Sequence, residues 1–284
     1  MELFALGCLK SPVDKKDYLI TNLVLDIMDK LPSEIDYTNQ MTPPRNQGNE
    51  GSCVGFATVA VREYQEKIDW AYILPPDGYV KLSPRYVYEL AKKISGTSEG
   101  TTLKAAAQVC VKNGICQERY WRYIPKQVGK PEEDADKNAA YYKIEPGYVR
   151  ITNEKELKAG LAKFGALLIA VKVYKNWYRD NKTGYIPDST WMEKLQGALG
   201  GHAICLVGYN DTTQKYKFKN SWQYSSGKWW GENGYGYLSY KELKFEFMEA
   251  IQMVDIRTNL PKEISISTIA DMGLINRFKA HLLI

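Results

Sequence analysis

The strongest constraint on the fold is that helical and strand patterns occupy different halves of this chain. Apolar residues repeat at helical spacing in the first half, whereas short apolar or alternating runs typical of strands fill most of the second half. Such a chain is expected to fold as an α+β protein in which the helices and the sheet pack as separate layers. The expected helices cover residues 53–68, 84–94, 102–112 and 154–164, and the expected strands cover residues 166–171, 202–209, 216–222, 234–238 and 249–254.

The change of pattern also predicts how the chain is divided. Residues 31–145 form a helical lobe, in which a polar and acidic stretch over 131–136 is expected to be a solvated loop, and residues 146–256 form a β-rich lobe. Residues 1–30 precede these lobes as an N-terminal arm, and residues 257–284 follow them as a C-terminal extension. The extension has apolar residues at helical spacing, which predicts a helix that packs on the protein itself or docks a partner. These residues are Ile269, Met272, Ile275, Phe278 and Leu282.

Charge and hydropathy exclude two classes of partner. The chain has 38 basic and 33 acidic side chains, giving a net charge of +5, and the two signs are mixed along the sequence. Nucleic acid is therefore not expected as the main partner, because nucleic-acid-binding proteins gather basic residues on one face. No apolar run approaches the roughly 18 residues that span a bilayer, and the start of the chain lacks the basic leader of an export signal.

The cysteines favour a reduced protein. The chain has five, Cys8, Cys53, Cys110, Cys116 and Cys205, and an odd number leaves at least one thiol without a partner in the monomer. Cys110 and Cys116 are spaced to allow a disulfide, but separate thiols in the cytoplasm or another reducing compartment are the preferred interpretation. No two cysteines have zinc-finger spacing and the two histidines lie far apart, so we predict no metal site and no cofactor.

A thiol and an imidazole are the strongest candidates for chemistry. Cys53 begins the first expected helix, where the positive end of the helix dipole favours a thiolate. The chain has only two histidines, and His281 lies in the C-terminal tail, so His202 is the expected base. The competing interpretation is that Cys53 is an ordinary buried thiol and His202 a core histidine.

Three further residues fit the same chemistry. Attack by the thiolate on an amide carbonyl creates an oxyanion, which the backbone N–H of Cys53 and the side-chain amide of Gln47 are placed to stabilise. Asn220 is expected to orient the His202 ring through a hydrogen bond. Trp222 is two residues further along an expected strand, hence on the same face, and is expected to cover that hydrogen bond from water.

Three blocks of the sequence resemble the papain-like cysteine peptidases. They are residues 47–56, residues 202–209, and Asn220-Ser221-Trp222 together with residues 230–235. The resemblance covers about residues 31–254 and implies a two-lobe fold, with a helical left lobe, a β-barrel-like right lobe and the active-site cleft between them. It also implies that Gln47 contributes to the oxyanion hole, that Cys53 is the nucleophile, that His202 is the base and that Asn220 orients it.

The resemblance also implies where a substrate lies and where this chain differs from the family. Gly100 and Thr101 resemble the glycine wall that pairs with the substrate backbone, and Gly201 and Trp222 are expected to line the cleft. Glu50 stands where secreted members carry a half-cystine, which favours a reducing compartment for this chain. Val54 replaces the usual aromatic residue after the nucleophile, and Gly201 replaces the usual Asp or Asn before the base.

The expected activity is hydrolysis of peptide bonds through a thioester acyl-enzyme, with a peptide or protein as substrate. No histidine pair is present to cap the cleft, which favours an endopeptidase. Two alternatives stay open at this stage: a catalytically silent binding or structural protein with the same fold, and transfer of the acyl group to an amine. The arm is expected either to lie over the cleft and restrain activity, as in a zymogen, or to pack on the back of a lobe.

Overall fold

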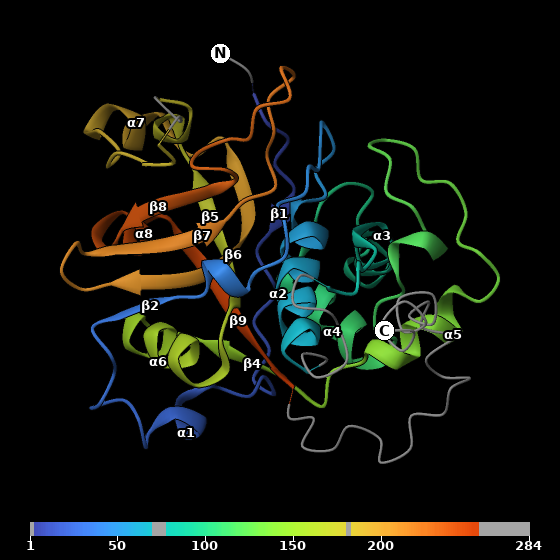
Figure 1. Cartoon of the computed structure of the whole chain (residues 1–284). Coiled ribbons are helices and arrows are strands. Elements are labelled where there is room, and N and C mark those ends of the chain that lie inside the picture. The colour runs from blue at the N-terminus through green and yellow to red at the C-terminus, as the bar shows by residue number, and fades with distance from the viewer. Residues whose placement is uncertain (1–2, 70–77, 180–182, 256–284) are drawn as a thin grey trace, which may run out of the picture.

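The computed structural model describes residues 3–69, 78–179 and 183–255. The helices α2 to α5 lie on one side of the molecule and a large sheet lies on the other, so the α+β organisation is confirmed (Figure 1). No helix in these three ranges is long and apolar enough to cross a membrane. The expected C-terminal extension, with its apolar helical face and His281, lies outside the described residues.

The helices of the first lobe form where the sequence predicts them. Ser83 caps α3 by accepting a hydrogen bond from the Tyr86 amide at 3.1 Å, and Thr102 caps α4 by accepting one from the Ala105 amide at 3.1 Å. The fourth helix begins inside the stretch that we expected to be a loop. The bounds are α2 Cys53–Asp69, α3 Pro84–Ser95, α4 Leu103–Lys112 and α5 Ala135–Ala139.

The second lobe is a seven-stranded sheet with the order β4-β9-β5-β6-β7-β8, in which all paired strands are antiparallel. A seventh strand, β2 (Glu34–Asp36), pairs with β6. The helices α6 (Glu154–Phe164), α7 (Trp191–Gln196) and α8 (Tyr240–Glu246) also belong to this part of the chain. The remaining strands are β4 Pro146–Ile151, β5 Leu167–Val173, β6 Gly200–Asn210, β7 Lys215–Lys219, β8 Tyr235–Ser239 and β9 Phe247–Asp255.

Successive side chains of β5 belong to different hydrophobic clusters, because they point to opposite faces of the sheet. Leu168 and Ala170 pack with the helices of the first lobe. Leu167 and Ile169 pack in the second cluster, which also contains Leu157 of α6. The strand is therefore apolar on both faces, which explains why its sequence is a continuous apolar run.

Two expectations need correction. Residues 31–145 do not all belong to the helical lobe, since β2 pairs through its backbone with β6 of the sheet. The strand β7 ends at Lys219, so Asn220 and Trp222 lie beyond its end and do not share a strand face. Both differences depend on backbone pairing between residues far apart in the sequence, which local hydrophobic periodicity does not predict.

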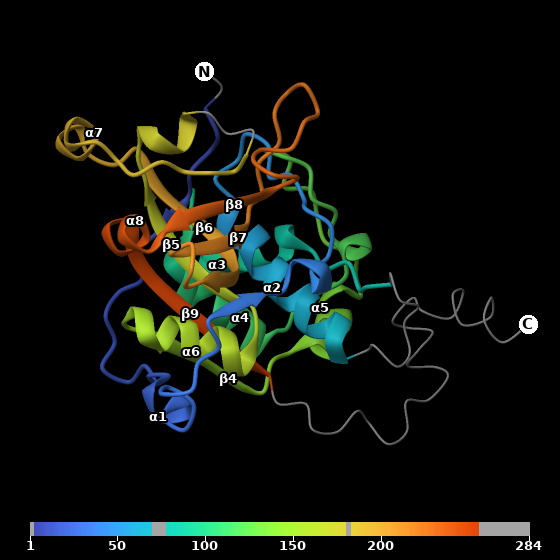
Figure 2. The same ribbon diagram turned by 60° about the vertical axis from the view of Figure 1, so that its left-hand side comes forward.

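The arm runs between the two lobes and then around the sheet. Its strand β1 (Cys8–Leu9) pairs in parallel with β3 (Thr101–Thr102) of the helical lobe and also contacts β6. Figure 1 shows this segment passing between the sheet and α2. Further on, Leu19 bridges to Arg150, and the short helix α1 (Thr21–Val24) packs near α6 (Figure 2).

A buried ion-pair cluster joins α2 of the helical lobe to β9 of the sheet. Arg62 of α2 lies 2.7 Å from a carboxylate oxygen of Asp255 at the end of β9, and it also pairs with Glu66 one turn along the helix. The Arg62 side chain is fully buried. Removal of one partner from such a cluster leaves buried charge without its compensation, which is costly.

We therefore expect Arg62→Ala to lower the free energy of unfolding by about 3–5 kcal/mol. The control is Lys155→Ala, which removes an exposed ion pair with Asp29 and should cost less than about 1 kcal/mol. Urea denaturation of both variants measures the difference. Equal losses in the two variants would contradict the role of the buried cluster.

Candidate active site

Cys53 is the first residue of α2 and is completely buried. The backbone N–H groups of Ala203, Gly7, Val54 and Cys53 itself lie close enough to favour its thiolate. Ala203 directly follows His202, so the contact with Ala203 joins the start of α2 to the strand that carries the expected base. Gly7 belongs to the arm, so part of the surroundings of the sulfur comes from residues 1–30.

Burial dominates the electrostatics of this thiol. It raises the pKa of Cys53 to about 11, although the four backbone N–H groups act in the opposite direction. The thiol is therefore protonated at neutral pH while the arm lies in place. Reactive thiols of this kind need a pKa of about 3.5–7.5.

His202 lies on β6 and is also completely buried. Its Nε2 atom lies 2.8 Å from Oδ1 of Asn220, so an Nε2–H donates to the Asn220 oxygen and leaves Nδ1 as the basic nitrogen. Nδ1 has no hydrogen-bond partner among the described residues. Burial lowers the pKa of His202 to about 4 despite the opposing effect of Asn220, so the ring is neutral at neutral pH.

Aromatic rings enclose the histidine. Trp222 stacks on His202 with ring centroids 4.3 Å apart and an interplanar angle of 25°, and Trp177 meets His202 edge-on at 6.1 Å. The indole of Trp222 is fully buried, so it shields the His202–Asn220 pair from water. Trp222 reaches this position from the loop after β7 and not from a shared strand face. Trp177 had no signal in the sequence analysis.

The side-chain amide of Gln47 is held by the other lobe. Its Oε1 atom accepts a hydrogen bond from Ser221 Oγ at 2.7 Å, and its backbone N–H donates to the Ser221 carbonyl at 3.0 Å. Its Nε2 atom donates to the carbonyl oxygens of Ala5 at 3.0 Å and Glu50 at 2.9 Å. The Ala5 carbonyl thus accepts the hydrogen bond of Gln47 Nε2. The same N–H group is suited to the carbonyl oxygen of a substrate or to the oxyanion formed from it.

The remaining predicted site residues also contact the arm. The Thr101 N–H donates to the Gly7 carbonyl at 2.9 Å, and a Cβ atom at Gly100 would lie 2.6 Å from that same oxygen. A Cβ atom at Gly201 would lie only 2.1 Å from the Cys8 carbonyl. The absence of side chains at Gly100 and Gly201 is therefore what lets an extended chain lie this close to both lobes.

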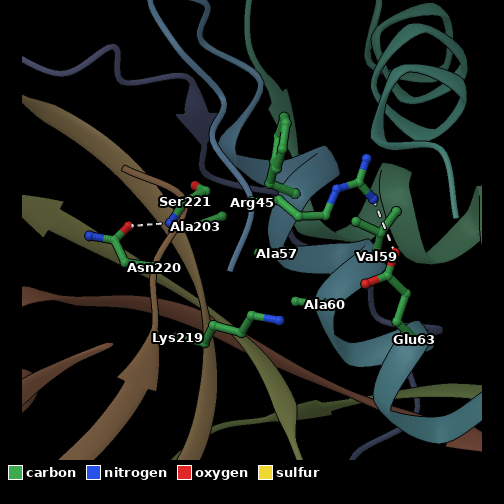
Figure 3. Close-up of a pocket in the computed structure, with 10 residues that line it drawn as sticks. Arg45, Ala57, Val59, Ala60, Glu63, Ala203, Lys219, Asn220 and Ser221 are labelled. Carbon is green, nitrogen blue, oxygen red and sulfur yellow. Dashed lines mark hydrogen bonds and ion pairs between the residues drawn. The ribbon is translucent and has the colours of Figure 1, made fainter. Parts of the chain in front are cut away.

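A small pocket lies between the two lobes, lined by Ala203 and Asn220 on one side and by residues of α2 on the other (Figure 3). The amine of Lys219 lies between the sheet and α2 and donates to the Thr42 carbonyl at 2.7 Å. Burial lowers the pKa of Lys219 to about 8. On the opposite wall Arg45 pairs with Glu63 at 3.0 Å. Thr42 links the two walls, because its hydroxyl accepts from Lys219 Nζ at 3.0 Å and donates to Glu63 at 2.8 Å, so we assign the pocket a structural role.

All five thiols are free, as preferred from the sequence. In place of the half-cystine expected in secreted relatives, Glu50 pairs with the buried Arg85 of α3 at 2.6 Å. The sequence points to Glu50 but carries no signal for its partner, because Arg85 is distant in the chain. Ser221 stands in the sequence only as part of a motif, without an expected role.

Comparison with known proteins agrees with this geometry. Residues 31–254 match a sequence-family model described as papain family cysteine protease. The chain belongs to the papain family. It is a papain-like thiol peptidase, and the α+β two-lobe fold expected for the family is confirmed.

Relatives of the papain family differ in how much of their length this chain matches. An uncharacterized peptidase C1-like protein of Acanthamoeba polyphaga mimivirus is 27% identical, over 83% of this chain and 81% of that protein. Mouse cathepsin K is 29% identical over 74% of this chain, which spans only 60% of that relative. The crystal structure of xylellain, a cysteine protease from Xylella fastidiosa, superposes with a TM-score of 0.73 at 26% identity, covering 89% of this chain and 99% of xylellain.

The placement of Gln47 generates a direct prediction for this papain-family site. Gln47→Ala removes the side-chain donor expected in the oxyanion hole, so the turnover number for a peptide substrate should fall by about 10²–10³. Steady-state kinetics measures this loss, and thermal denaturation monitors the fold because the Ser221 contact is lost as well. An unchanged turnover number in a folded variant would contradict the assignment of Gln47.

Proposed function

We propose that this protein is an endopeptidase that hydrolyses internal peptide bonds through a thioester acyl-enzyme, and that its N-terminal arm holds it inactive. The single observation that carries the proposal is the hydrogen bond from Gln47 Nε2 to the Ala5 carbonyl at 3.0 Å. A carbonyl of the chain itself lies where the carbonyl of a substrate has to bind, beside a buried nucleophile.

The chemistry proceeds through two steps once the arm has left. Cys53 passes its proton to Nδ1 of His202, and the resulting thiolate attacks the substrate carbonyl, whose oxyanion is stabilised by Gln47 Nε2 and the Cys53 N–H. The imidazolium then protonates the leaving amine, and a thioester remains on Cys53. A water molecule, deprotonated by His202, hydrolyses the thioester and restores the thiol.

The direction of the arm supports inhibition without self-cleavage. A substrate places its leaving amine near His202, hence near Trp222, and its acyl side toward Gly100 and Thr101. The arm runs the opposite way, because Phe4 stacks on Trp222 at 4.7 Å while Cys8 and Leu9 pair with β3. Its peptide bonds are therefore presented to Cys53 in reverse.

The course of the arm also supports endopeptidase action. Residues 4–9 lie along the cleft on both sides of Cys53, from Trp222 to Thr101. A cleft that accommodates an extended chain in both directions accepts the middle of a polypeptide. The five free thiols agree with a reducing compartment as its place of action.

Among the described residues of the arm, only residues 4–9 lie along the cleft. Ile20 and Val24 are fully buried and pack in the hydrophobic cluster of the second lobe, so removal of residues 1–30 takes away part of the core. A chain that begins at Ser11 keeps these residues and also keeps the hydrogen bond from Ser11 Oγ to Glu249 at 2.7 Å. It is the cleaner variant for a test of inhibition.

We expect the chain beginning at Ser11 to hydrolyse a peptide blocked at both ends at least about tenfold faster than the full chain, since it needs no displacement of the arm. In the full chain, Phe4→Ala should raise the rate about two- to tenfold through loss of the ring contact with Trp222. Mass spectrometry of the products locates the cleaved bond.

The control is Lys15→Ala, an exposed position of the arm outside the cleft, which should leave the rate unchanged. Equal rates for the full and shortened chains would refute inhibition by the arm. Absence of cleavage in every variant, with Cys53 still open to alkylation, would instead favour a silent binding protein.

The pKa values predict how Cys53 reacts in each form. In the full chain the thiol, with a pKa of about 11, should react slowly with iodoacetamide at neutral pH, and the rate should rise steadily up to about pH 11. In the chain beginning at Ser11 water reaches the sulfur and the imidazole, so the rate at neutral pH should be much higher. Peptide mapping after alkylation measures Cys53 separately from the four other thiols, and identical pH profiles would contradict the prediction.

A further inference from the structure

A polar cluster outside the nucleophile and base holds the loop between Gln47 and Cys53. It consists of Glu50, Arg85 and Tyr123, which we call the brace. The two carboxylate oxygens of Glu50 accept from the two terminal nitrogens of Arg85 at 2.6 and 2.7 Å. One of these oxygens also accepts from the Lys126 N–H at 2.8 Å. A two-point contact of this kind fixes orientation as well as distance.

Arg85 is a rigid anchor for this contact. It belongs to the first turn of α3, and its side chain is completely buried. Its guanidinium donates to the Ile124 carbonyl at 2.6 Å and lies 4.6 Å from the centre of the Tyr123 ring. These contacts fix the planar guanidinium of Arg85. The loop that carries Glu50 is therefore held in a fixed position relative to α3.

Within the brace, Tyr123 contacts Glu50 and both ends of the loop. Its hydroxyl lies 2.7 Å from the Gln47 carbonyl, 2.7 Å from Ser52 Oγ and 3.0 Å from a carboxylate oxygen of Glu50. Gln47 carries the side-chain donor to the oxyanion, and Ser52 directly precedes the N–H of Cys53, the second donor. One hydroxyl group thus contacts the residues that carry or precede both donors.

We propose that Glu50, Arg85 and Tyr123 are positioning residues for peptide hydrolysis, which set the spacing of the two oxyanion donors by ionic and hydrogen-bonded contacts in place of a covalent cross-link. None of the three contacts the reacting atoms, and each acts through Gln47 or the Cys53 N–H. The inference rests on the proposed function, because an oxyanion forms only if the cleft hydrolyses an acyl bond.

The test is Glu50→Gln, which keeps the shape of the side chain and removes its charge. It is made in the full chain and in the full chain that carries Phe4→Ala. We expect the turnover number for the blocked peptide to fall about 10–100-fold with KM changed less than about twofold, because a displaced donor weakens mainly the transition state. Alkylation of Cys53 by iodoacetamide develops no oxyanion, so its rate should change less than about twofold.

A matched control uses the same arginine. Glu89 also pairs with Arg85, at 3.0 Å, and its described hydrogen bonds and ion pairs do not involve residues 47–53. Glu89→Gln should leave the turnover number within about twofold of its reference. An equal loss in Glu89→Gln and Glu50→Gln would overturn the proposal, because it would indicate general loss of the ion-pair cluster.

Two more variants separate positioning from folding. Tyr123→Phe removes a single hydroxyl group, so it serves if Glu50→Gln does not fold, and it should lower the turnover number in the same direction. In Gln47→Ala, which already lacks one donor, Tyr123→Phe should cost less than it does alone. Additive losses, or a parallel fall in the alkylation rate, would overturn the proposal.

The outcomes also separate this inference from the proposed function. If the reference proteins hydrolyse the peptide and Glu50→Gln hydrolyses it equally well, only the positioning role fails. If the reference proteins and the chain beginning at Ser11 all fail to hydrolyse it while Cys53 reacts with iodoacetamide, the proposed function fails and the inference fails with it.

Discussion

The packing of α2 against β6 is the contact on which the rest of the site depends. It brings the sulfur of Cys53, at the first turn of the helix, close to the N–H of Ala203, which directly follows His202 on the strand. Neither lobe contains both groups, so the reaction requires the lobes to stay together. The buried contact of Arg62 with Asp255 below the site and the bonds between Gln47 and Ser221 within it serve this requirement.

The arm uses the same groove and changes the electrostatics of the site. With it in place, Cys53 and His202 are both excluded from water, and burial moves the pKa of the thiol upward and that of the imidazole downward. Both shifts favour the neutral forms, and a neutral thiol is a much weaker nucleophile than its thiolate. In the proposed inhibition, occlusion by the arm acts on access and on protonation together, whereas a lid above an already charged pair would act on access alone.

The loop before the nucleophile illustrates how different contacts can serve one need. Its two proposed oxyanion donors, Gln47 and the Cys53 N–H, are six residues apart and require a fixed spacing. With all five thiols free, Glu50 and Arg85 supply a non-covalent restraint. Its strength comes from burial of Arg85 and from two-point geometry, because an exposed ion pair would contribute little.

The sequence predicted the helices over 53–68 and 154–164 and most of the strands, because local periodicity carries that information. It also pointed to Cys53, His202, Asn220 and Gln47 as the site, through their chemistry and the family resemblance. The pairing of β2 with β6, the position of Trp222 beyond the end of β7, the partner of Glu50 and the passage of the arm through the cleft were decided only by the tertiary structure. Each joins residues far apart in the chain, and such contacts depend on the mutual placement of elements, which no local pattern encodes.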